Sequence, residues 1–477
     1  MNESSRRARL THLLAALEGT QGVAGSPGTA ELLERTARAL AANGDSGVWL
    51  ALAVMNGRLP LRAEVIAFRR ELSVAGHDAG VAALVRRAPL RGPAVTIVRE
   101  AVVVDVHHTA QTDLATGIQR VVRKTVEQWR LRHSIVLVGW ERGYTGLREL
   151  GPAEVERALH GGPPVAQRGP SAFIVPWDST FLLPELAIEN ERTQRIQALA
   201  EFSGNASGVI GYDTVPLTSG ETTGGGMPAA FARNLRAVAE MSRVATISEA
   251  AATEYMGWRQ MLAGIGMLGP DVRAIPLATE AEDVSDEDRR RVREEFAPDD
   301  LPFLLCVGSH EPRKNHLAVL AACESLWNAG RRFRLGFVGG NGWRGESFAA
   351  AVSRLVDAGR PVVTRRALSD GLLWAAYERA DATVFPSLNE GYGLPVAESL
   401  LAGTPVVTSG FGSMREIAAG GGALLVDPRD DRDIADAIDR VLFDEETASR
   451  LRAEARRRTG RSWSDYSKEL WSYLVEN

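Results

Sequence analysis

The sequence is poor in cysteine and carries no excess of basic residues. Cys306 and Cys323 are the only cysteines among 477 residues, too few for a disulfide framework or a four-thiolate zinc site. The formal net charge of −5 disfavours a dedicated nucleic-acid-binding protein, because such proteins present a basic surface. We therefore expect a protein of a reducing, cytoplasmic compartment with no nucleic acid among its partners.

Long apolar runs are also lacking. The apolar patch within residues 10–17 is interrupted by Thr11 and His12. It is far shorter than the ~20 residues that a bilayer span needs, and no small-residue cleavage site follows it. Hydrophobic residues make up 45% and charged residues 24% of the chain, as in ordinary globular proteins. At about 150 residues per domain, the length suggests roughly three folded units.

Residues 1–95 are predicted to be helical. Leu33, Ala37 and Leu40 recur at helical spacing, and breaks are expected around residues 19–27, 43–47 and 56–60. Since no pattern of catalytic residues occurs here, we interpret this part as a helical cap or interaction module.

The pattern changes to alternating strands and helices after Pro93. The β-branched runs 95–98 and 101–106 are typical of strands buried on both faces of a parallel sheet. An amphipathic helix over 116–132 and a strand over 134–139 complete a βαβ unit. The alternation predicts a first α/β domain.

A second alternation follows a charged helix at 283–295, which we interpret as a linker. Strands are expected at 303–308, 334–339, 361–364 and 382–385. This order is typical of a doubly wound parallel sheet. Since ligands bind at the carboxyl ends of such strands, two such domains would face one cleft.

Residues 389–398, Asn-Glu-Gly-Tyr-Gly-Leu-Pro-Val-Ala-Glu, join a buried strand to the start of a helix. Pro395 suits a first helical turn, whose free N–H groups and positive dipole end favour an anion. Gly391 and Gly393 would let the backbone approach a ligand closely. The segment therefore predicts an anion-binding turn.

Two carboxylates bracket this turn. Glu390 and Glu398 are eight residues apart and can point into one pocket, one at each end of an extended ligand. Carboxylates accept hydrogen bonds from hydroxyl groups. Carboxylates beside an anion-binding helix start predict a ligand that has both phosphates and sugar rings.

A second strand-to-helix turn, residues 308–315, carries two cations. Arg313 and Lys314 can bind phosphate, the guanidinium as a fork and the ammonium as a point charge. The alternative is a solvated helix start. Because cations at a helix N-terminus oppose the dipole, the pattern favours a bound anion.

These motifs resemble the family-four retaining glycosyltransferases of the GT-B fold, the group 1 type, which includes many bacterial mannosyl-, glucosyl- and rhamnosyltransferases. Glu390 and Glu398 match the E-x7-E signature, and residues 308–315 match the phosphate motif. Residues 116–120 are similar to the glycine-bearing first loop of the family. Trp463 is similar to the start of its C-terminal helix.

The resemblance implies an α/β fold with two facing, doubly wound Rossmann-like domains and a helical N-terminal extension. It divides the chain into the extension (1–95), an acceptor domain (96–280), a nucleotide-sugar donor domain (281–460) and a C-terminal helix that crosses back to the first domain (461–477).

The resemblance also implies roles for site residues. Glu398 would hold the ribose hydroxyls, and Glu390 would contact the donor sugar. Arg313 and Lys314 would bind the diphosphate and stabilise the leaving group. The other donor-binding candidates are Gly308, Ser309, Gly391, Tyr392, Gly393 and Leu394. The acceptor-side candidates are Gly117, Arg120, Tyr212 and Asp213. Ser309 and Tyr212 depart from the family, which often has a basic residue and a histidine there.

The expected activity is transfer of a hexose or deoxyhexose from a nucleoside diphosphate sugar to a glycan, glycolipid or other glycoconjugate in polysaccharide biosynthesis. The family reaction retains anomeric configuration by a front-face route, and we expect no metal and no other cofactor. Two alternatives stay open, a nucleotide-sugar epimerase on the same fold and a non-catalytic GT-B scaffold.

Two further features allow two interpretations each. The six arginines of residues 450–461 form either a solvated helix face or a contact with anionic lipid headgroups at the inner face of the cell membrane. His107 and His108 follow a strand, and are either solvated or directed into the cleft. Cys306 and Cys323 are expected in the core.

Overall fold

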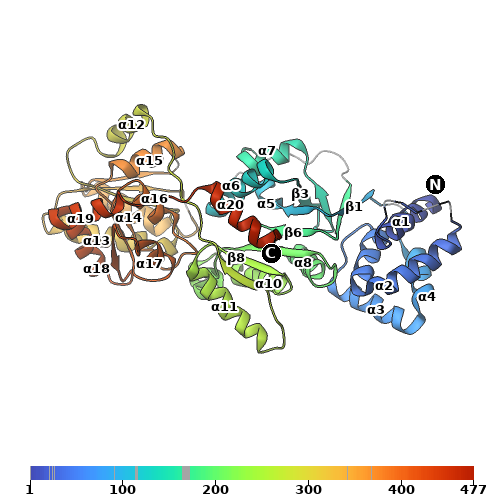
Figure 1. The fold of residues 1–477 in the computed structure, drawn as a ribbon. Helices are drawn as coiled ribbons and strands as arrows, with labels where there is room; N and C mark the ends of the chain where they lie inside the picture. The colour runs from blue at the N-terminus through green and yellow to red at the C-terminus, as the bar shows by residue number, and fades with distance from the viewer. Residues whose placement is uncertain are drawn as a thin grey trace.

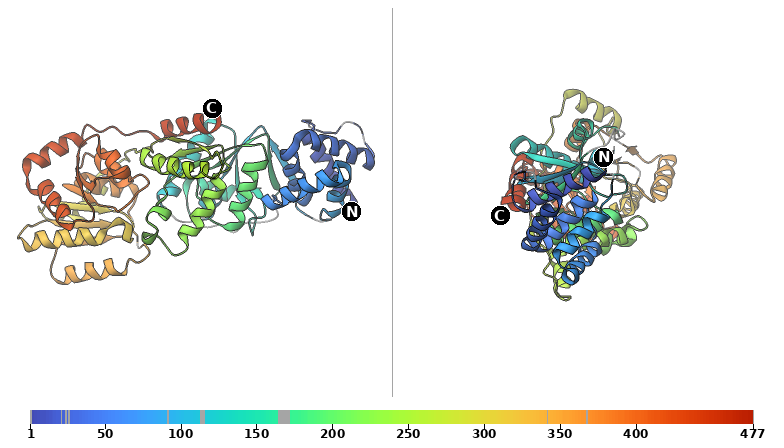
Figure 2. Two further views of the ribbon diagram at one scale, coloured as in Figure 1. Left: turned by 90° about the horizontal axis from the view of Figure 1, so that it is seen from below. Right: turned by 90° about the vertical axis from the view of Figure 1, so that its right-hand side faces the viewer.

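The computed structural model describes residues 2–20, 22–23, 25, 27–90, 92–112, 116–163, 172–340, 342–366 and 368–476, with the side chains of residues 5 onward. Three units lie in a row, as Figures 1 and 2 show: a helical unit at the N-terminus, a first sheet unit in the middle and a second sheet unit at the far end. No helix in these ranges combines the length and the apolar composition that crossing a membrane requires.

The N-terminal unit consists of α1 (Asn2–Leu17), α2 (Thr29–Asn56), α3 (Arg62–Ala75) and α4 (His77–Arg87). The break expected at 43–47 is a kink within α2, where Gly44 has φ 55°. The fully buried residues of this unit, such as Trp49, belong to one core with Phe173 and Trp177 of the first sheet. The helices therefore cover an end of that sheet.

The first sheet unit contains nine strands within the described residues, in the order β1-β5-β4-β3-β2-β6-β7-β8-β9. Apart from β4, which runs antiparallel to β3 and β5, neighbouring strands are parallel. The strands are β1 (Val95–Arg99), β2 (Val102–Asp105), β3 (Ile135–Trp140), β4 (Leu147–Glu149), β5 (Phe173–Trp177), β6 (Thr180–Leu183), β7 (Ala206–Gly211), β8 (Arg243–Thr246) and β9 (Asp271–Ala274).

Helices cover this sheet and place its loops. The helices are α5 (His107–Gln111), α6 (Gly117–Arg132), α7 (Pro152–His160), α8 (Asn190–Phe202), α9 (Val215–Thr218), α10 (Met227–Val238) and α11 (Glu249–Ala263), with the 3-10 turn η1 (Gly220–Thr222). The apolar face of α6, with Val122, Val126 and Trp129, is buried in the unit's second core cluster. Its polar first turn is thereby directed toward the second sheet unit.

The second sheet unit has six parallel strands within the described residues, in the order β12-β11-β10-β13-β14-β15. They are β10 (Phe303–Val307), β11 (Arg334–Val338), β12 (Val362–Arg365), β13 (Ala382–Phe385), β14 (Val406–Ser409) and β15 (Ala423–Val426). The accompanying helices are α12 (Asp286–Phe296), η2 (Pro312–Lys314), α13 (His316–Asn328), α14 (Glu346–Asp357), α15 (Asp370–Arg379), α16 (Leu394–Leu401), α17 (Gly412–Ala418), α18 (Asp431–Phe443) and α19 (Glu445–Ala455). The alternating α/β fold class is confirmed.

The charged helix α12 is not a linker, contrary to the sequence-based interpretation. Val292 and Phe296 are fully buried in a core cluster with Phe303 and Tyr377. These two apolar residues stand four positions apart and so share one helix face. They make α12 an integral part of the second sheet unit.

The chain crosses between the sheet units twice. The first crossing, at Thr279, and the second, at Arg461, form an isolated antiparallel bridge. After the second crossing, α20 (Trp463–Trp471) and the π-helical turn η3 (Ser472–Glu476) lie on the first sheet unit. The indole of Trp129 donates a hydrogen bond to the Ser467 carbonyl at 3.0 Å. Figure 1 shows α20 beside α6, far from the strands that precede it in sequence.

Candidate active site

Two loops that follow neighbouring parallel strands meet at the carboxyl end of the second sheet. Arg313 and Lys314 lie in η2 after β10, and Glu390 lies after β13. Arg313 Nη1 is 2.7 Å from Glu390 Oε2, and Lys314 Nζ is 2.6 Å from Oε1. The Ser387 hydroxyl donates to the same Oε1 at 2.6 Å. The two motifs predicted from sequence therefore form one buried cluster.

The electrostatics of this cluster follow from its burial. The Glu390 side chain is 9% exposed. Burial alone would raise its pKa, but the charges of Arg313 and Lys314 outweigh it and lower the pKa to about 2. Arg313 also pairs with Glu311 at 2.9 Å and donates to the Asn389 carbonyl at 2.7 Å. These contacts fix the orientation of the Arg313 and Lys314 side chains at the carboxyl ends of the strands.

The helix α16 begins at Gly393, which has φ 109° and ψ 51°, and Pro395 lies in its first turn. Glu398 stands one turn further along, with a side chain 5% exposed. The Tyr377 hydroxyl donates to its Oε2 at 3.0 Å. Arg120 Nη1, from α6 of the first sheet unit, donates to its Oε1 at 2.6 Å. The second predicted carboxylate is therefore bound across the gap between the units.

The glycine-rich loop before α16 touches the first sheet unit at Gly391. A Cβ added there would lie 2.7 Å from Asp213 Oδ2 and 2.9 Å from the Tyr212 carbonyl oxygen, so only glycine fits. The Ser248 hydroxyl donates to the Gly391 carbonyl at 2.7 Å. At Gly117, an added Cβ would meet Leu394 Cδ1 at 3.8 Å. Gly117, Asp213 and Leu394 therefore belong to one interface.

Asp213 is the carboxylate that the first sheet unit brings to this interface. It follows β7, and its Oδ1 accepts a hydrogen bond from the Val215 amide at 3.1 Å. Burial raises its pKa to about 6, against the opposing effect of the nearby Arg313. Asp213 and Glu390 are thus two carboxylates of one site with pKa values displaced in opposite directions.

Two predicted side chains do not face the cluster. The Tyr212 hydroxyl donates to the Pro184 carbonyl at 2.7 Å, and its ring is packed in the core of the first sheet unit. Because successive residues of an extended chain point to opposite sides, Tyr212 is buried where Asp213 is directed outward. The Tyr392 hydroxyl donates to the Leu277 carbonyl at 3.2 Å, beside the crossing between the units. At the cluster, therefore, only the backbone of Tyr392 can contact a ligand.

The first positions of the turn at residues 308–315 lie beside the cluster. At Gly308, an added Cβ would be 3.6 Å from the Phe385 ring and 3.7 Å from Lys314 Cδ. The Ser309 hydroxyl is 3.2 Å from Glu311 Oε1. Both residues therefore stand at the carboxyl end of β10, next to the two cations.

A buried polar network lies at the carboxyl ends of β2 and β6. Arg192, with a side chain 0% exposed, is 3.0 Å from Asp105 and 2.8 Å from Glu185. His108 Nε2 is 2.7 Å from Glu189 Oε1. His107 and His108 were identified from the sequence, whereas Glu185 and Glu189 were not, because these two acids lie about 80 residues further along the chain. His108 is therefore paired within the first sheet unit.

Other sequence features also find partners within the chain. Arg450 pairs with Glu454, Arg458 donates to the Ile417 carbonyl, and Arg461 donates to the Pro276 carbonyl. Cys306 and Cys323 are free thiols buried in the core, as expected.

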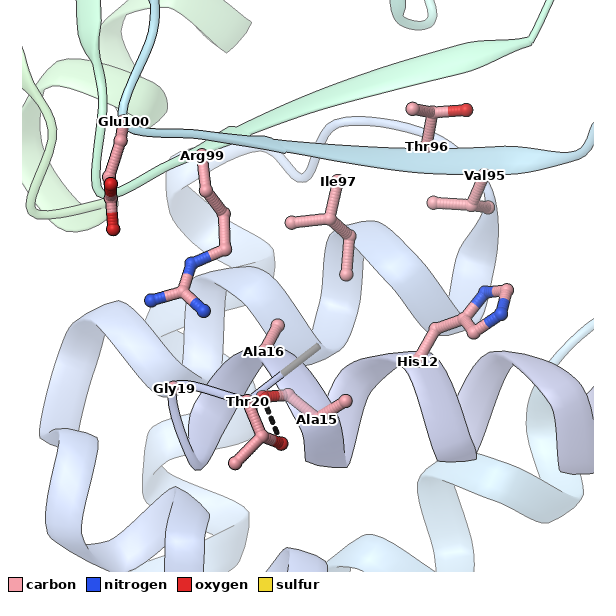
Figure 3. Close-up of a pocket in the computed structure, with 10 residues that line it drawn as sticks. All are labelled: His12, Ala15, Ala16, Gly19, Thr20, Val95, Thr96, Ile97, Arg99 and Glu100. Carbon is pink, nitrogen blue, oxygen red and sulfur yellow. Dashed lines mark hydrogen bonds between the residues drawn. The ribbon is translucent and has the colours of Figure 1, made fainter. Parts of the chain in front are cut away.

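Several hollows of the described chain lie outside the cluster. One of about 230 Å³ at the crossing is lined by Tyr392, Arg458 and Arg461 among others. Another of about 740 Å³ lies between α1 and β1, where Ile97 and Arg99 point toward the helix (Figure 3). The second contains none of the predicted site residues. The described residues contain no group of three or more His, Cys, Asp or Glu side chains suited to a metal ion.

Comparisons with known proteins bear on the second sheet unit. Residues 288–458 match the family model "Glycosyl transferases group 1". The serotype-specific mannosyltransferase WbdA of Escherichia coli is 34% identical over 117 residues, 24% of this chain and 14% of WbdA. The D-inositol 3-phosphate glycosyltransferase of Thermomonospora curvata is 32% identical over 179 residues, 36% of this chain and 41% of that protein. The chain therefore spans less than half the length of these relatives.

Solved structures extend the likeness to both sheet units. Sucrose-phosphate synthase from Thermosynechococcus elongatus superposes with a TM-score of 0.53 at 16% identity, over 79% of this chain and 96% of that one. HepE of Anabaena, solved in complex with UDP and glucose, superposes with a TM-score of 0.55 at 13% identity, over 80% and 100% of the two chains. At such low identity the likeness concerns the fold, which is GT-B as predicted. Residues 288–458 thus match the group 1 glycosyltransferase family, within a chain that has the GT-B fold.

Proposed function

We propose that the protein is a retaining glycosyltransferase that uses a nucleoside diphosphate sugar as donor. The observation that carries this proposal is the pairing of Arg313 and Lys314 with Glu390 beside the start of α16, with Glu398 one turn away. The family of residues 288–458 and the transferase names of the relatives support it. HepE, which shares the fold, is described with UDP and glucose.

The nucleotide end of the donor is assigned to Glu398. Its carboxylate accepts two hydrogen bonds, which is what two vicinal ribose hydroxyls would offer. Tyr377 would keep its hydrogen bond to Oε2, while the ribose takes the place of Arg120 on Oε1. Nucleotide binding would then release Arg120 from Glu398.

The diphosphate and the sugar are assigned to the Glu390 end. Breaking the bond between the anomeric carbon and the diphosphate oxygen leaves negative charge on the phosphate. Arg313 and Lys314, already oriented by Glu390, would stabilise that charge without reorganisation. Amide groups at Gly393 and Leu394, at the start of α16, would add to the same effect. Glu390 and Asp213 would accept hydrogen bonds from hydroxyl groups of the sugar.

During transfer the hydroxyl group of the acceptor substrate loses its proton, and the donor substrate must provide a base that takes it. In a front-face reaction, the acceptor oxygen bonds to the anomeric carbon on the face that the phosphate leaves, and the acceptor proton passes to the departing phosphate oxygen. Configuration is retained without a protein nucleophile, unlike the two-carboxylate route of retaining glycosidases. We propose that the two cations replace a metal ion in this step.

The acceptor is assigned to the first sheet unit, opposite the donor. Gly117 and Arg120 begin α6 at the interface, so the acceptor would approach along this helix. A glycan or lipid-linked glycan of polysaccharide biosynthesis fits the names of the relatives, among them an O-antigen chain mannosyltransferase. The reaction would take place in the cytoplasm, where nucleotide sugars are made.

The test begins with the donor. Thermal unfolding of the purified protein is followed with UDP, GDP, dTDP and ADP and with their common sugar conjugates, with and without EDTA. A ligand at 100 times its Kd should stabilise the unit that binds it by about 2.7 kcal/mol. The Glu398→Gln variant serves as the control for the site. If no nucleotide shifts the unfolding transition, the donor assignment is wrong.

Transfer is then measured with the selected donor and glycolipid or glycan fractions as acceptors. We expect acceptor-dependent release of the nucleoside diphosphate, and NMR of the product should show the anomeric configuration of the donor. An inverted product would contradict the retaining mechanism. An isomerised donor formed without acceptor would instead indicate an epimerase.

A further inference from the structure

The helix α11 and the loop after it expose an apolar surface that the proposed reaction does not use. Figures 1 and 2 show α11 projecting from the first sheet unit, with its loop at the outer end before the chain returns to β9. We call residues 256–269 the apolar tip. In the described chain, four of its large hydrophobic side chains are exposed, Met256 (45%), Met261 (74%), Ile265 (74%) and Leu268 (88%).

Much of the tip borders open space within the described residues, although Trp258 packs against a core cluster of the first sheet unit. A Cβ added at Gly257 or Gly266 would have no atom within 4 Å. Arg259 Nε donates to the Leu268 carbonyl at 3.2 Å, which ties the loop back to the helix. The exposed side chains therefore lie on a segment with a defined local structure, and exposed hydrophobic side chains on such a segment can form an interaction site.

The tip carries positive charge and no negative charge. Residues 255–270 contain no aspartate or glutamate, and Arg259 is the one charged side chain. The acids on either side are turned to other partners. Glu254 accepts hydrogen bonds from the amide and hydroxyl of Thr214, and Asp271 accepts one from the Tyr473 hydroxyl. A negatively charged surface would meet apolar side chains and a cation, with no acid opposing it.

We propose that the apolar tip binds the protein to a lipid bilayer that contains anionic lipids. Methionine, isoleucine and leucine side chains on a protruding tip can enter the boundary between headgroups and acyl chains, and an arginine among them attracts anionic headgroups. A protein partner would need a groove to receive a projecting tip, whereas a bilayer offers a deformable surface. This proposal is independent of the donor chemistry.

One helix connects the tip to the interface between the two sheet units. Ser248, the N-cap of α11, donates to the Gly391 carbonyl, and Glu416 of α17 accepts from the first amides of the helix. The helix has 15 residues, so at about 1.5 Å per residue it spans ~22 Å. A protein anchored by the tip would hold this interface about that far from the membrane surface.

The experiment is flotation of the full-length protein with vesicles of phosphatidylcholine alone and of phosphatidylcholine with about 30% phosphatidylglycerol, an anionic lipid. The tip variant combines Met261→Ser, Ile265→Ser and Leu268→Ser. The control variant combines Val74→Ser, Leu131→Ser and Leu425→Ser, which remove exposed apolar side chains (89%, 74% and 47%) elsewhere. Circular dichroism and thermal unfolding check that each variant is folded.

We expect the wild type and the control to bind the anionic vesicles and the tip variant to bind at least tenfold more weakly. Arg259→Gln should weaken binding about fivefold on anionic vesicles only. Equal binding of the tip variant and the wild type overturns the proposal, as does absence of wild-type binding to either vesicle. A concentration-dependent dimer that the tip variant abolishes also overturns it, because the tip would then be a self-association surface.

Discussion

The two carboxylates of the candidate site are held in different ways. Glu390 takes its cationic partners, Arg313 and Lys314, from the adjacent strand-to-helix turn of its own sheet unit. Glu398 takes its cationic partner, Arg120, from the other sheet unit. Both side chains are nearly buried, so the difference lies in the origin of the partner.

The two ends of the site therefore depend on the fold in different ways. The Glu390 end is assembled by one folded unit, so its geometry does not depend on how the two sheet units are arranged. The Glu398 end is complete only when α6 stands against α16. The end that we propose for the sugar and diphosphate is thus preorganised, while the end proposed for the ribose responds to the relative position of the units. Four predictions test this difference.

The largest effect is expected at the preorganised end. Arg313→Ala removes the side chain that holds both Glu390 and the Asn389 carbonyl, and we expect kcat to fall about 10²- to 10³-fold. Arg313→Lys should recover part of the rate, because it restores the charge without the forked geometry. The measurement is acceptor-dependent release of the nucleoside diphosphate.

The control for this prediction is Arg354→Ala, which removes an exposed ion pair with Glu324 on the surface of the same sheet unit. Its activity should equal that of the wild type. An Arg313→Ala enzyme with more than half of the wild-type kcat would contradict the assignment of the cluster.

The next effect concerns ribose binding. Glu398→Gln keeps the shape of the side chain and removes the charge, and we expect the donor KM to rise roughly 10- to 100-fold with little change in kcat. Calorimetric titration with the free nucleoside diphosphate should show the same factor. A collapse of kcat at constant KM would instead place Glu398 at the reacting bond.

A smaller effect of opposite sign is expected at Arg120. If the guanidinium competes with ribose for Glu398, Arg120→Ala should tighten nucleoside diphosphate binding about two- to fivefold. Lys124→Ala is the matched control, because Lys124 lies on the same helix as Arg120 and its ammonium is 3.9 Å from Glu282. Weaker binding by Arg120→Ala would show that Arg120 holds the nucleotide directly.

The smallest effect is on stability. The pKa of Glu390, lowered to about 2 from 4.5, gives stability above pH 4.5 that is lost as the pH falls toward 2. The pKa of Asp213 is raised from 3.8 to about 6, so the folded state binds more protons between these values and stability falls as the pH rises from about 4 to 6.

Thermal midpoints at several pH values check both signs. Glu390→Gln should flatten the loss of stability below pH 4.5. Asp213→Asn should remove the fall between pH 4 and 6 and raise the midpoint at pH 7. An Asp213→Asn protein that is less stable than the wild type at pH 7 would show that the charged carboxylate is stabilising.

The sequence predicted the residues that lie at strand-to-helix turns, and the reason is local. Glycine, proline and charged residues directly after a buried β-branched run lie at the carboxyl end of the sheet, where ligands of such folds bind. Arg313, Lys314, Glu390 and Glu398 were found in this way. Elements with weak local patterns were missed, such as the three-residue strand β4 and the four-residue strand β6.

Errors arose where a side chain's direction or packing decided its role. Tyr212 follows a strand as Asp213 does, yet Tyr212 is packed inside and Asp213 is directed to the interface with the second sheet unit. The helix α12 was interpreted as a linker because its charges outnumber Val292 and Phe296, which bury it against the second sheet unit. In both cases the decisive contact is made with a residue far along the chain.

The sequence by itself determined the alternation of strands and helices, the two motif turns and therefore the kind of ligand that the second sheet unit can bind. The tertiary structure alone decided that Arg120 meets Glu398 across 278 positions of sequence, that Asp213 stands against Gly391, and that the apolar tip projects outward. Local structure follows from hydrogen bonding and periodicity among neighbours. The strength of a charge and the exposure of an apolar side chain depend instead on burial and distance, which exist only once the chain has folded.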